Sequence, residues 1–100
     1  MLKIKKKIKG DSCTVTLDGK VDMTTSMKLE EELAPLAGTV KELIIDLSGL
    51  VYISSAGLRV LVATQKTMNG KGNLILTDPR PGVMEIFTVT GMDRILKIEN

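Results

Sequence analysis

The segment VKELIIDL, residues 40–47, most constrains how this chain folds. Leu43, Ile44 and Ile45 form a continuous apolar run, which is typical of a central strand covered on both faces. We therefore expect a sheet built around residues 40–47, followed by a short loop over residues 48–53.

Strand-like and helical patterns alternate along the rest of the chain. Residues 2–9 and 12–18 predict two strands joined at Gly10-Asp11, a dipeptide that suits a tight hairpin. Apolar spacing and end signals predict three helices and two further strands. The helices are expected over about residues 25–36, from the serines at 54–55 to about 68, and over 83–91; the strands are expected over 73–78 and 94–99. Because strands alternate with helices, we predict an α/β fold of order β-β-α-β-α-β-α-β with a mixed, mostly parallel sheet.

The composition indicates one globular domain over residues 1–100. Apolar residues make up 43% and charged residues 26% of the sequence, which is a soluble balance. No apolar run approaches the roughly 20 residues that span a bilayer, and the N-terminus lacks a secretory pattern. The only cysteine, Cys13, alternates with Val15 and Leu17 and is expected in the core. These features lead us to expect a cytoplasmic protein.

Several classes of site are excluded by the residues that the chain lacks. Without histidine, neither a Ser-His-Asp nor a Cys-His arrangement exists, nor a histidine-ligated metal. Tyr52 and Phe87 are the only aromatic residues, which disfavours a stacking platform for single-stranded nucleic acid. No Ser-x-x-Lys spacing and no Gly-rich phosphate loop occur. We expect no enzyme activity, no metal and no cofactor.

The first segment carries a concentration of positive charge. Leu2, Ile4 and Ile8 share one parity, and most of the lysines share the other. The lysines of this segment are Lys3, Lys5, Lys6, Lys7 and Lys9. They could contact phosphates, but the pattern favours a half-buried strand whose lysines protect the sheet edge. We therefore expect no direct binding to nucleic acid or membrane.

Two adjacent serines, Ser54 and Ser55, stand at the predicted start of the second long helix. A serine there can cap the unpaired amides of the first turn. The same place suits a phosphorylated serine, because the positive end of the helix dipole stabilises a phosphate; Ala56 and Gly57 would leave room for it. A phosphate adds about −1.5 to −2 charges at pH 7 and would turn off binding to a partner at this surface.

Three segments resemble the STAS domain of bacterial anti-sigma factor antagonists: VDMTTSMKLEEEL, ELIIDLSGLVYISSAGLRVL and GKGNLILTDPRPGVMEIFTVTGMDRILKI. The middle segment is the specific part. Asp46-Leu47-Ser48 and then residues 54–58, SSAGL, match the family pattern, in which an Asp precedes a serine at a helix start. The resemblance covers nearly the whole chain and implies one STAS-like domain with its helices mainly on one face of the sheet.

The resemblance also implies which serine is modified. Aligned on Gly57-Leu58, the phosphorylated residue is Ser55, with Ser54 as the second choice. Ser54 stands where many members have an Asp, and Ala56 stands where they have a second Ser or Thr. Ser54 is therefore expected to cap the helix and Ser55 to be the switch.

In this family the unphosphorylated protein binds an anti-sigma factor, a serine/threonine kinase of the GHKL type, and so frees the sigma factor. The phosphorylated form cannot bind, and a phosphatase, expected to be of the PP2C type, restores the unphosphorylated form. GKVD, residues 19–22, resembles the turn before the family's first helix and would place Asp22 near Ser55; alternatively, Asp22 caps local amides. Thr24, Thr25 and Ser26 are candidate caps of the first helix. The partner-binding residues implied are Asp22, Thr24, Ser54, Ser55, Ala56, Gly57, Leu58 and Arg59.

Other interpretations remain open at this point. In a response-regulator receiver domain, Asp46 could be the phosphorylated residue, but no acidic pair follows the first strand. STAS domains also act without a phospho-switch, as interaction modules in transporters, stress-signalling complexes and lipid-trafficking assemblies, and fold does not determine function. Ser55 as an enzyme nucleophile would need a neighbouring base that the sequence does not provide.

Overall fold

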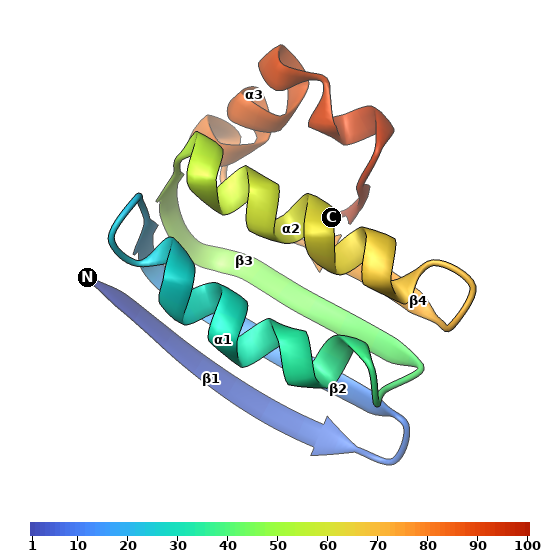
Figure 1. The fold of residues 1–100 in the computed structure, drawn as a ribbon. Coiled ribbons are helices and arrows are strands. Elements are labelled where there is room, and N and C mark those ends of the chain that lie inside the picture. The colour runs from blue at the N-terminus through green and yellow to red at the C-terminus, as the bar shows by residue number, and fades with distance from the viewer.

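The fold is described from a computed structural model that covers residues 1–100. Its elements in chain order are β1 (Leu2–Lys9), β2 (Ser12–Val21), α1 (Ser26–Ala37), β3 (Glu42–Ile53), α2 (Ser55–Met68), β4 (Asn73–Thr77), α3 (Pro81–Thr90), the short 3₁₀ helix η1 (Met92–Arg94) and β5 (Lys97–Glu99). The predicted order of strands and helices is confirmed, with the 3₁₀ turn as an addition (Figure 1).

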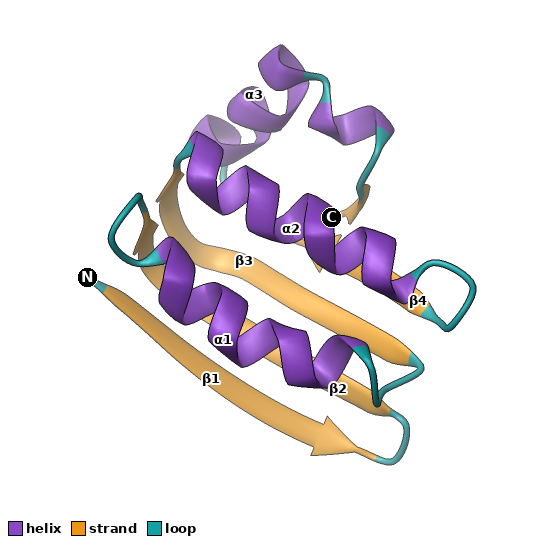
Figure 2. Ribbon diagram, viewed as in Figure 1, coloured by secondary structure: helices purple, strands orange, loops and turns teal.

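The five strands form one sheet in the order β1-β2-β3-β4-β5. β1 pairs with β2 antiparallel as a hairpin, and every other neighbouring pair is parallel. The predicted mixed, mostly parallel sheet is therefore confirmed, with β3 in its centre. Figure 2 shows α1 and α2 side by side across one face of this sheet, and α3 lies near the end of β3.

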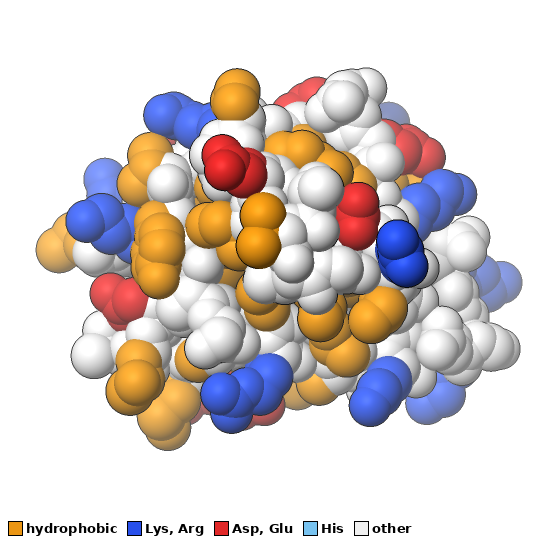
Figure 3. All heavy atoms as spheres, turned by 90° about the horizontal axis from the view of Figure 1, so that it is seen from above, with side chains coloured by type: hydrophobic (Ala, Val, Ile, Leu, Met, Phe, Trp, Pro, Cys, Tyr) orange, Lys and Arg blue, Asp and Glu red, His pale blue; other side chains and the backbone are white.

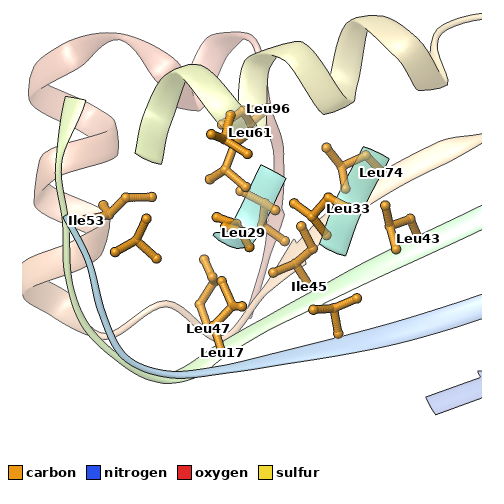
Figure 4. Packing of buried hydrophobic residues seen from close by; sticks show 14 of the residues in the cluster. Leu17, Leu29, Leu33, Leu43, Ile45, Leu47, Ile53, Leu61, Leu74 and Leu96 are labelled. Carbon is orange, nitrogen blue, oxygen red and sulfur yellow. The ribbon is translucent and has the colours of Figure 1, made fainter. Parts of the chain in front are cut away.

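The core lies between the sheet and the two helices that cross it. Alternate residues of the strands point into it, and they meet the apolar stripe of each helix. Figure 4 shows Leu29 and Leu33 of α1 beside Ile45 and Leu47 of β3, with Leu61 of α2 above them. Burying this surface supplies the main free energy of folding. Cys13 is fully buried on β2, as the alternation predicts.

The prediction that the central strand is covered on both faces is wrong. Leu43, Ile45 and Leu47 are fully buried, whereas Ile44 between them is only partly buried. Successive side chains of a strand point to opposite faces, and the crossing helices α1 and α2 lie on the same face. Ile44 therefore lies on the open face, where it pairs in register with Thr14 of β2 and Ile75 of β4.

The expected loop over residues 48–53 is also corrected by the structure. β3 continues without a break to Ile53, because β2 continues alongside it as far as Val21. Val21 pairs with Ile53 and Lys20 with Tyr52, after two irregularities in the register. The pairing carries both strands to the point where α2 begins.

The remaining boundaries differ by a few residues from those expected. α1 passes through Pro35 and ends at Ala37, with Gly38 at its C-cap as expected. α3 begins earlier than predicted, with Pro81 in its first turn, where a missing N–H costs nothing. The last strand is shorter, because residues 92–94 form η1 before β5 begins at Lys97.

β1 has the two-sided character that its sequence predicts. Leu2 and Ile4 lie on the face toward the helices, and the lysines at odd positions lie on the open face. Lys6 is the exception, since its parity places it toward the helices, where it forms an ion pair with Glu32 of α1. None of the helices has the length and apolar character needed to cross a bilayer.

Candidate functional site

Ser54 lies between the end of β3 and the first residue of α2. Its backbone is extended (φ −88°, ψ 172°), and its amide donates to the carbonyl of Val21 on β2 at 2.7 Å. Its hydroxyl oxygen accepts a hydrogen bond from the amide of Gly57 at 3.3 Å. The prediction that Ser54 caps this helix is confirmed, because one of the four unpaired amides of the first turn finds its partner there.

Gly57 allows α2 to start in close contact with the sheet. A Cβ at this buried position would lie 2.6 Å from Cγ1 of Val21 and 2.7 Å from Cγ1 of Ile53. Both atoms belong to β-branched side chains, which are stiff at χ1. The sequence-based interpretation that Gly57 leaves room for a phosphate is therefore wrong: the space is taken by the ends of β2 and β3.

Ser55, in contrast, is exposed at the first position of α2. Its hydroxyl makes no hydrogen bond within the protein. The structure therefore assigns the two serines different environments. Ser54 is hydrogen-bonded to the backbone through its amide and its hydroxyl, whereas the Ser55 hydroxyl is unbonded and exposed to solvent.

A groove of about 550 Å³ opens beside Ser55, between α2 and the segment that joins α3 to η1. It is lined by Ser55, Leu58, Arg59, Val62, Ala63, Lys66, Thr90 and Met92. The two ionisable residues in this lining are cations, and neither forms an ion pair. Figure 3, which views the molecule from the side of α3, shows hydrophobic side chains reaching the surface among charged ones.

Five of these lining residues are not predicted from the sequence. Val62 is only partly buried and lies in the groove. Ala63 and Lys66 continue the same side of α2, so helical spacing counted from Ser55 could have found them. Thr90 and Met92 come from the end of α3 and from η1, and no local pattern connects them to the serines.

Asp22 stands at the end of β2, directly after the residue that pairs with Ile53. One oxygen, Oδ1, accepts hydrogen bonds from the amide (2.9 Å) and the hydroxyl (2.7 Å) of Thr24, and from the amide (3.0 Å) and the hydroxyl (3.1 Å) of Thr25. These bonds, first the one from the Thr24 hydroxyl and then the one from the Thr25 amide, lower the pKa of Asp22 from 3.8 to about 2. The expectation that Asp22 caps local amides is confirmed.

The expected caps of α1 are corrected accordingly. Thr25 occupies the N-cap position, but its side chain accepts no hydrogen bond from a helix amide. Its oxygen accepts from the amide of Asp22 at 2.9 Å and lies 3.0 Å from the carbonyl of Lys20. Ser26 is buried inside the first turn, and its hydroxyl donates to the carbonyl of Met23. The hydrogen bonds of the Asp22 carboxylate therefore stabilise the turn before α1, and the Thr24 hydroxyl fixes the position of that carboxylate.

Exposed apolar side chains flank this end of the sheet. Met23 follows Asp22, Met27 lies in the first turn of α1, and Val51 and Tyr52 precede the serines on β3; all four are exposed. Large apolar side chains that gather on a surface are a common feature of protein-binding sites. No group of three or more His, Cys, Asp or Glu side chains is placed to hold a metal ion. The arrangement displays a hydroxyl beside apolar and cationic groups.

The chain was compared with known proteins. The family model of the STAS domain matches residues 3–100. BtrV of Bordetella bronchiseptica is 36% identical over 86 residues, which cover 84% of this chain and 74% of BtrV. The anti-sigma-B factor antagonist of Bacillus subtilis is 33% identical over 85 residues, which cover 84% of this chain and 78% of that protein. The receiver-domain interpretation, with Asp46 as the modified residue, is therefore wrong.

Solved structures have the same fold. The anti-sigma factor antagonist SpoIIAA of Bacillus in its unphosphorylated form matches with a TM-score of 0.81, covering 100% of this chain and 89% of SpoIIAA. Its phosphorylated form matches with a TM-score of 0.74. The sequence identity is 16% in both cases, so these matches establish the fold alone.

Proposed function

Because this chain belongs to the STAS domain family, we propose that it is an anti-sigma factor antagonist, a binding protein that sequesters an anti-sigma factor and so frees a sigma factor. Similar proteins that carry this name, among them the one from Bacillus subtilis, support the proposal. Regulation by phosphorylation is supported by one observation: the hydroxyl of Ser55 is exposed and makes no hydrogen bond at the rim of the groove.

The antagonist is switched by phosphorylation of Ser55. An anti-sigma factor of the GHKL kinase type transfers the γ-phosphoryl group of ATP to Oγ of Ser55. The Oγ–P bond forms, the bond to the ADP leaving group breaks, and the hydroxyl proton passes to a base of the kinase. Ser55 needs no rearrangement to be reached, whereas Ser54 would give up its hydrogen bond with Gly57. A phosphatase of the PP2C type removes the phosphate.

The unmodified surface binds the anti-sigma factor. It comprises Asp22 and Thr24 at the end of β2 and residues 54–59 at the start of α2. Exposed Met23 and Tyr52 add apolar contact area beside the serine. A phosphate on Ser55 places about two negative charges in this contact, where removing them from water is costly. The phosphorylated chain therefore releases its partner.

The test uses the full chain with a GHKL-type anti-sigma factor and ATP. Mass spectrometry of the products is expected to locate one phosphate, on Ser55. Binding of the anti-sigma factor is expected to survive in Ser55→Ala and to be lost in Ser55→Asp. Thr67→Asp, which places the same charge at the far end of α2, serves as the control and is expected to bind.

Two results would count against the proposal. Phosphate found on Ser54 alone would show that Ser54, and not Ser55, is the switch. Equal binding by Ser55→Asp and Ser55→Ala would favour the alternative function, a STAS interaction module in another signalling, transport or lipid-trafficking assembly that works without a phospho-switch.

A further inference from the structure

Arg59 and Ser55 lie four residues apart on one uninterrupted helix and line the same groove. Residues at this spacing are neighbours on the helix surface, with about 5–6 Å between their Cβ atoms. Both side chains are exposed, so neither would lose buried contacts on moving toward the other. A phosphate on Oγ of Ser55 would extend this reach further toward the guanidinium.

No charged group of the unmodified chain is paired with Arg59, so its guanidinium is free to bind an anion. It forms no ion pair and no side-chain hydrogen bond in the unmodified chain. The other cation of the groove, Lys66, lies eleven residues from Ser55, or about 16 Å along the helix axis at 1.5 Å per residue. No carboxylate lines the groove.

Nearby ionisable groups outside the groove do not compete for Arg59. Asp22 is held by Thr24 and Thr25 at the end of β2. Glu30 of α1 lies on the other side of α2, where it lines a separate hollow. Asp93 and Arg94 of η1 and Glu85 of α3 are exposed and lie outside the groove lining.

We propose that Arg59 binds the phosphate of phosphorylated Ser55, and that the same guanidinium binds a carboxylate of the partner when Ser55 is unmodified. The inference rests on the phosphorylation proposed above. An acidic group N-terminal to a basic one at this spacing is the favourable orientation in a helix. Guanidinium and phosphate also form short, charge-assisted hydrogen bonds, often two in parallel.

The chemistry of the partner follows from the groove. Two unpaired cations, Arg59 and Lys66, stand beside an apolar lining that includes Leu58, Val62 and Met92. Charge complementarity selects an acidic segment with an apolar face, such as an amphipathic helix of the anti-sigma factor. Phosphorylation then acts twice, because it adds an anion and also withdraws Arg59 from the partner's carboxylate.

The first test requires no kinase, because phosphoserine is installed at position 55 during synthesis of the full chain. Titration of the phosphate by ³¹P NMR gives its second pKa, ordinarily about 6. Removal of a nearby cation disfavours the dianion, so the Arg59→Gln variant is expected to raise this pKa by about 0.5. Lys66→Gln, which removes the same charge from the same groove, is the matched control and is expected to leave it unchanged.

Three further results test the contact between Arg59 and the phosphate. Arg59→Lys is expected to raise the second pKa less than Arg59→Gln does, because the lysine keeps the positive charge. In 1 M salt the difference in pKa between the parent and Arg59→Gln is expected to become smaller, because salt screens the interaction. An equal second pKa in the parent and in Arg59→Gln would overturn the contact. So would equal changes in Arg59→Gln and Lys66→Gln, because that result would indicate net charge alone.

The second test measures binding of the unphosphorylated chain to its anti-sigma factor. Arg59→Gln is expected to weaken binding by about two- to fivefold, the range of an exposed ion pair. Unchanged affinity would overturn the role of Arg59 toward the partner. A chain that no kinase modifies would contradict the proposed function and leave the titration result standing, so the two failures are distinguishable.

Discussion

At the scale of single residues, the carboxylate of Asp22 and the hydroxyl of Thr24 form one unit. Asp22 Oδ1 accepts four hydrogen bonds, from the amide and the hydroxyl of Thr24 and of Thr25, and the Asp22 pKa of about 2 follows from them. Because the folded pKa lies below the unfolded value, these bonds stabilise the fold above about pH 4. That contribution is lost as the pH falls from about 4 to 2, when the carboxylate becomes protonated.

Replacement of the donor tests this account. In Thr24→Val the bond from the Thr24 hydroxyl is lost, while the bonds from the two amides and from the Thr25 hydroxyl remain. The pKa of Asp22 is therefore expected to rise from about 2 part of the way to its ordinary value of 3.8. ¹³C NMR titration of the side-chain carboxyl measures the value. Thr88→Val is the control, because that hydroxyl bonds to Met84 on α3. An unchanged pKa in Thr24→Val would contradict the assignment of its cause.

The two serines make a second pair of predictions at this scale. Ser54→Ala removes the cap from α2 and is expected to lower the free energy of unfolding by about 1 kcal/mol. Ser54→Asp is expected to keep the stability, because Asp and Ser are equally good caps. Ser55→Ala is the control: the Ser55 hydroxyl makes no hydrogen bond, so its removal is expected to change the free energy of unfolding little. Urea unfolding measures all three, and equal losses in the two alanine variants would refute the division of roles.

At the scale of elements, the fit between the start of α2 and the ends of β2 and β3 depends on Gly57. In Gly57→Ala the new methyl group would overlap the side chains of Val21 and Ile53. Overpacking costs about 1–3 kcal/mol, which outweighs the gain of about 1 kcal/mol that alanine brings to a helix. We expect a net loss of stability of up to about 2 kcal/mol.

Chemical unfolding of Gly57→Ala measures this loss against a matched change in another helix. Gly82 of α3 is exposed, and a Cβ there would meet nothing within 4 Å. Gly82→Ala is therefore expected to be neutral or to stabilise by up to about 1 kcal/mol. Equal effects of the two substitutions would show that helix propensity, and not the packing at Gly57, decides the outcome.

The elements also show which features a sequence carries locally. The helical spacing of Leu58 and Leu61 predicted α2 well, because the pattern involves residues that are close in the sequence. The extension of β3 through Ser48 and Gly49 was missed, because two turn-forming residues interrupt the pattern there and the strand continues through its pairing with β2. Ser55 was found from a motif, whereas Met92 enters the groove from a segment distant in sequence.

At the scale of the whole molecule, one sheet face carries the crossing helices and the two sheet edges are open to other chains. Edge strands expose unpaired backbone groups and can pair with a second molecule. β5 is only three residues long, which offers little for pairing. β1 is eight residues long, and its protection depends on Lys3, Lys5, Lys7 and Lys9, which follow one another along its open face.

Removal of that charge is expected to expose the edge. The double variant Lys5→Val with Lys7→Val makes the open face of β1 apolar and raises its β propensity, beside Thr16 and Thr14 of β2. We expect it to sediment as a larger species than the parent in analytical ultracentrifugation, increasingly so with concentration. Lys28→Val with Lys71→Val removes the same charge from exposed positions on α1 and the turn before β4, and is expected to sediment as the parent does. Association of both double variants would assign the effect to net charge, and association of neither would show that the lysines of β1 are not what protects the edge.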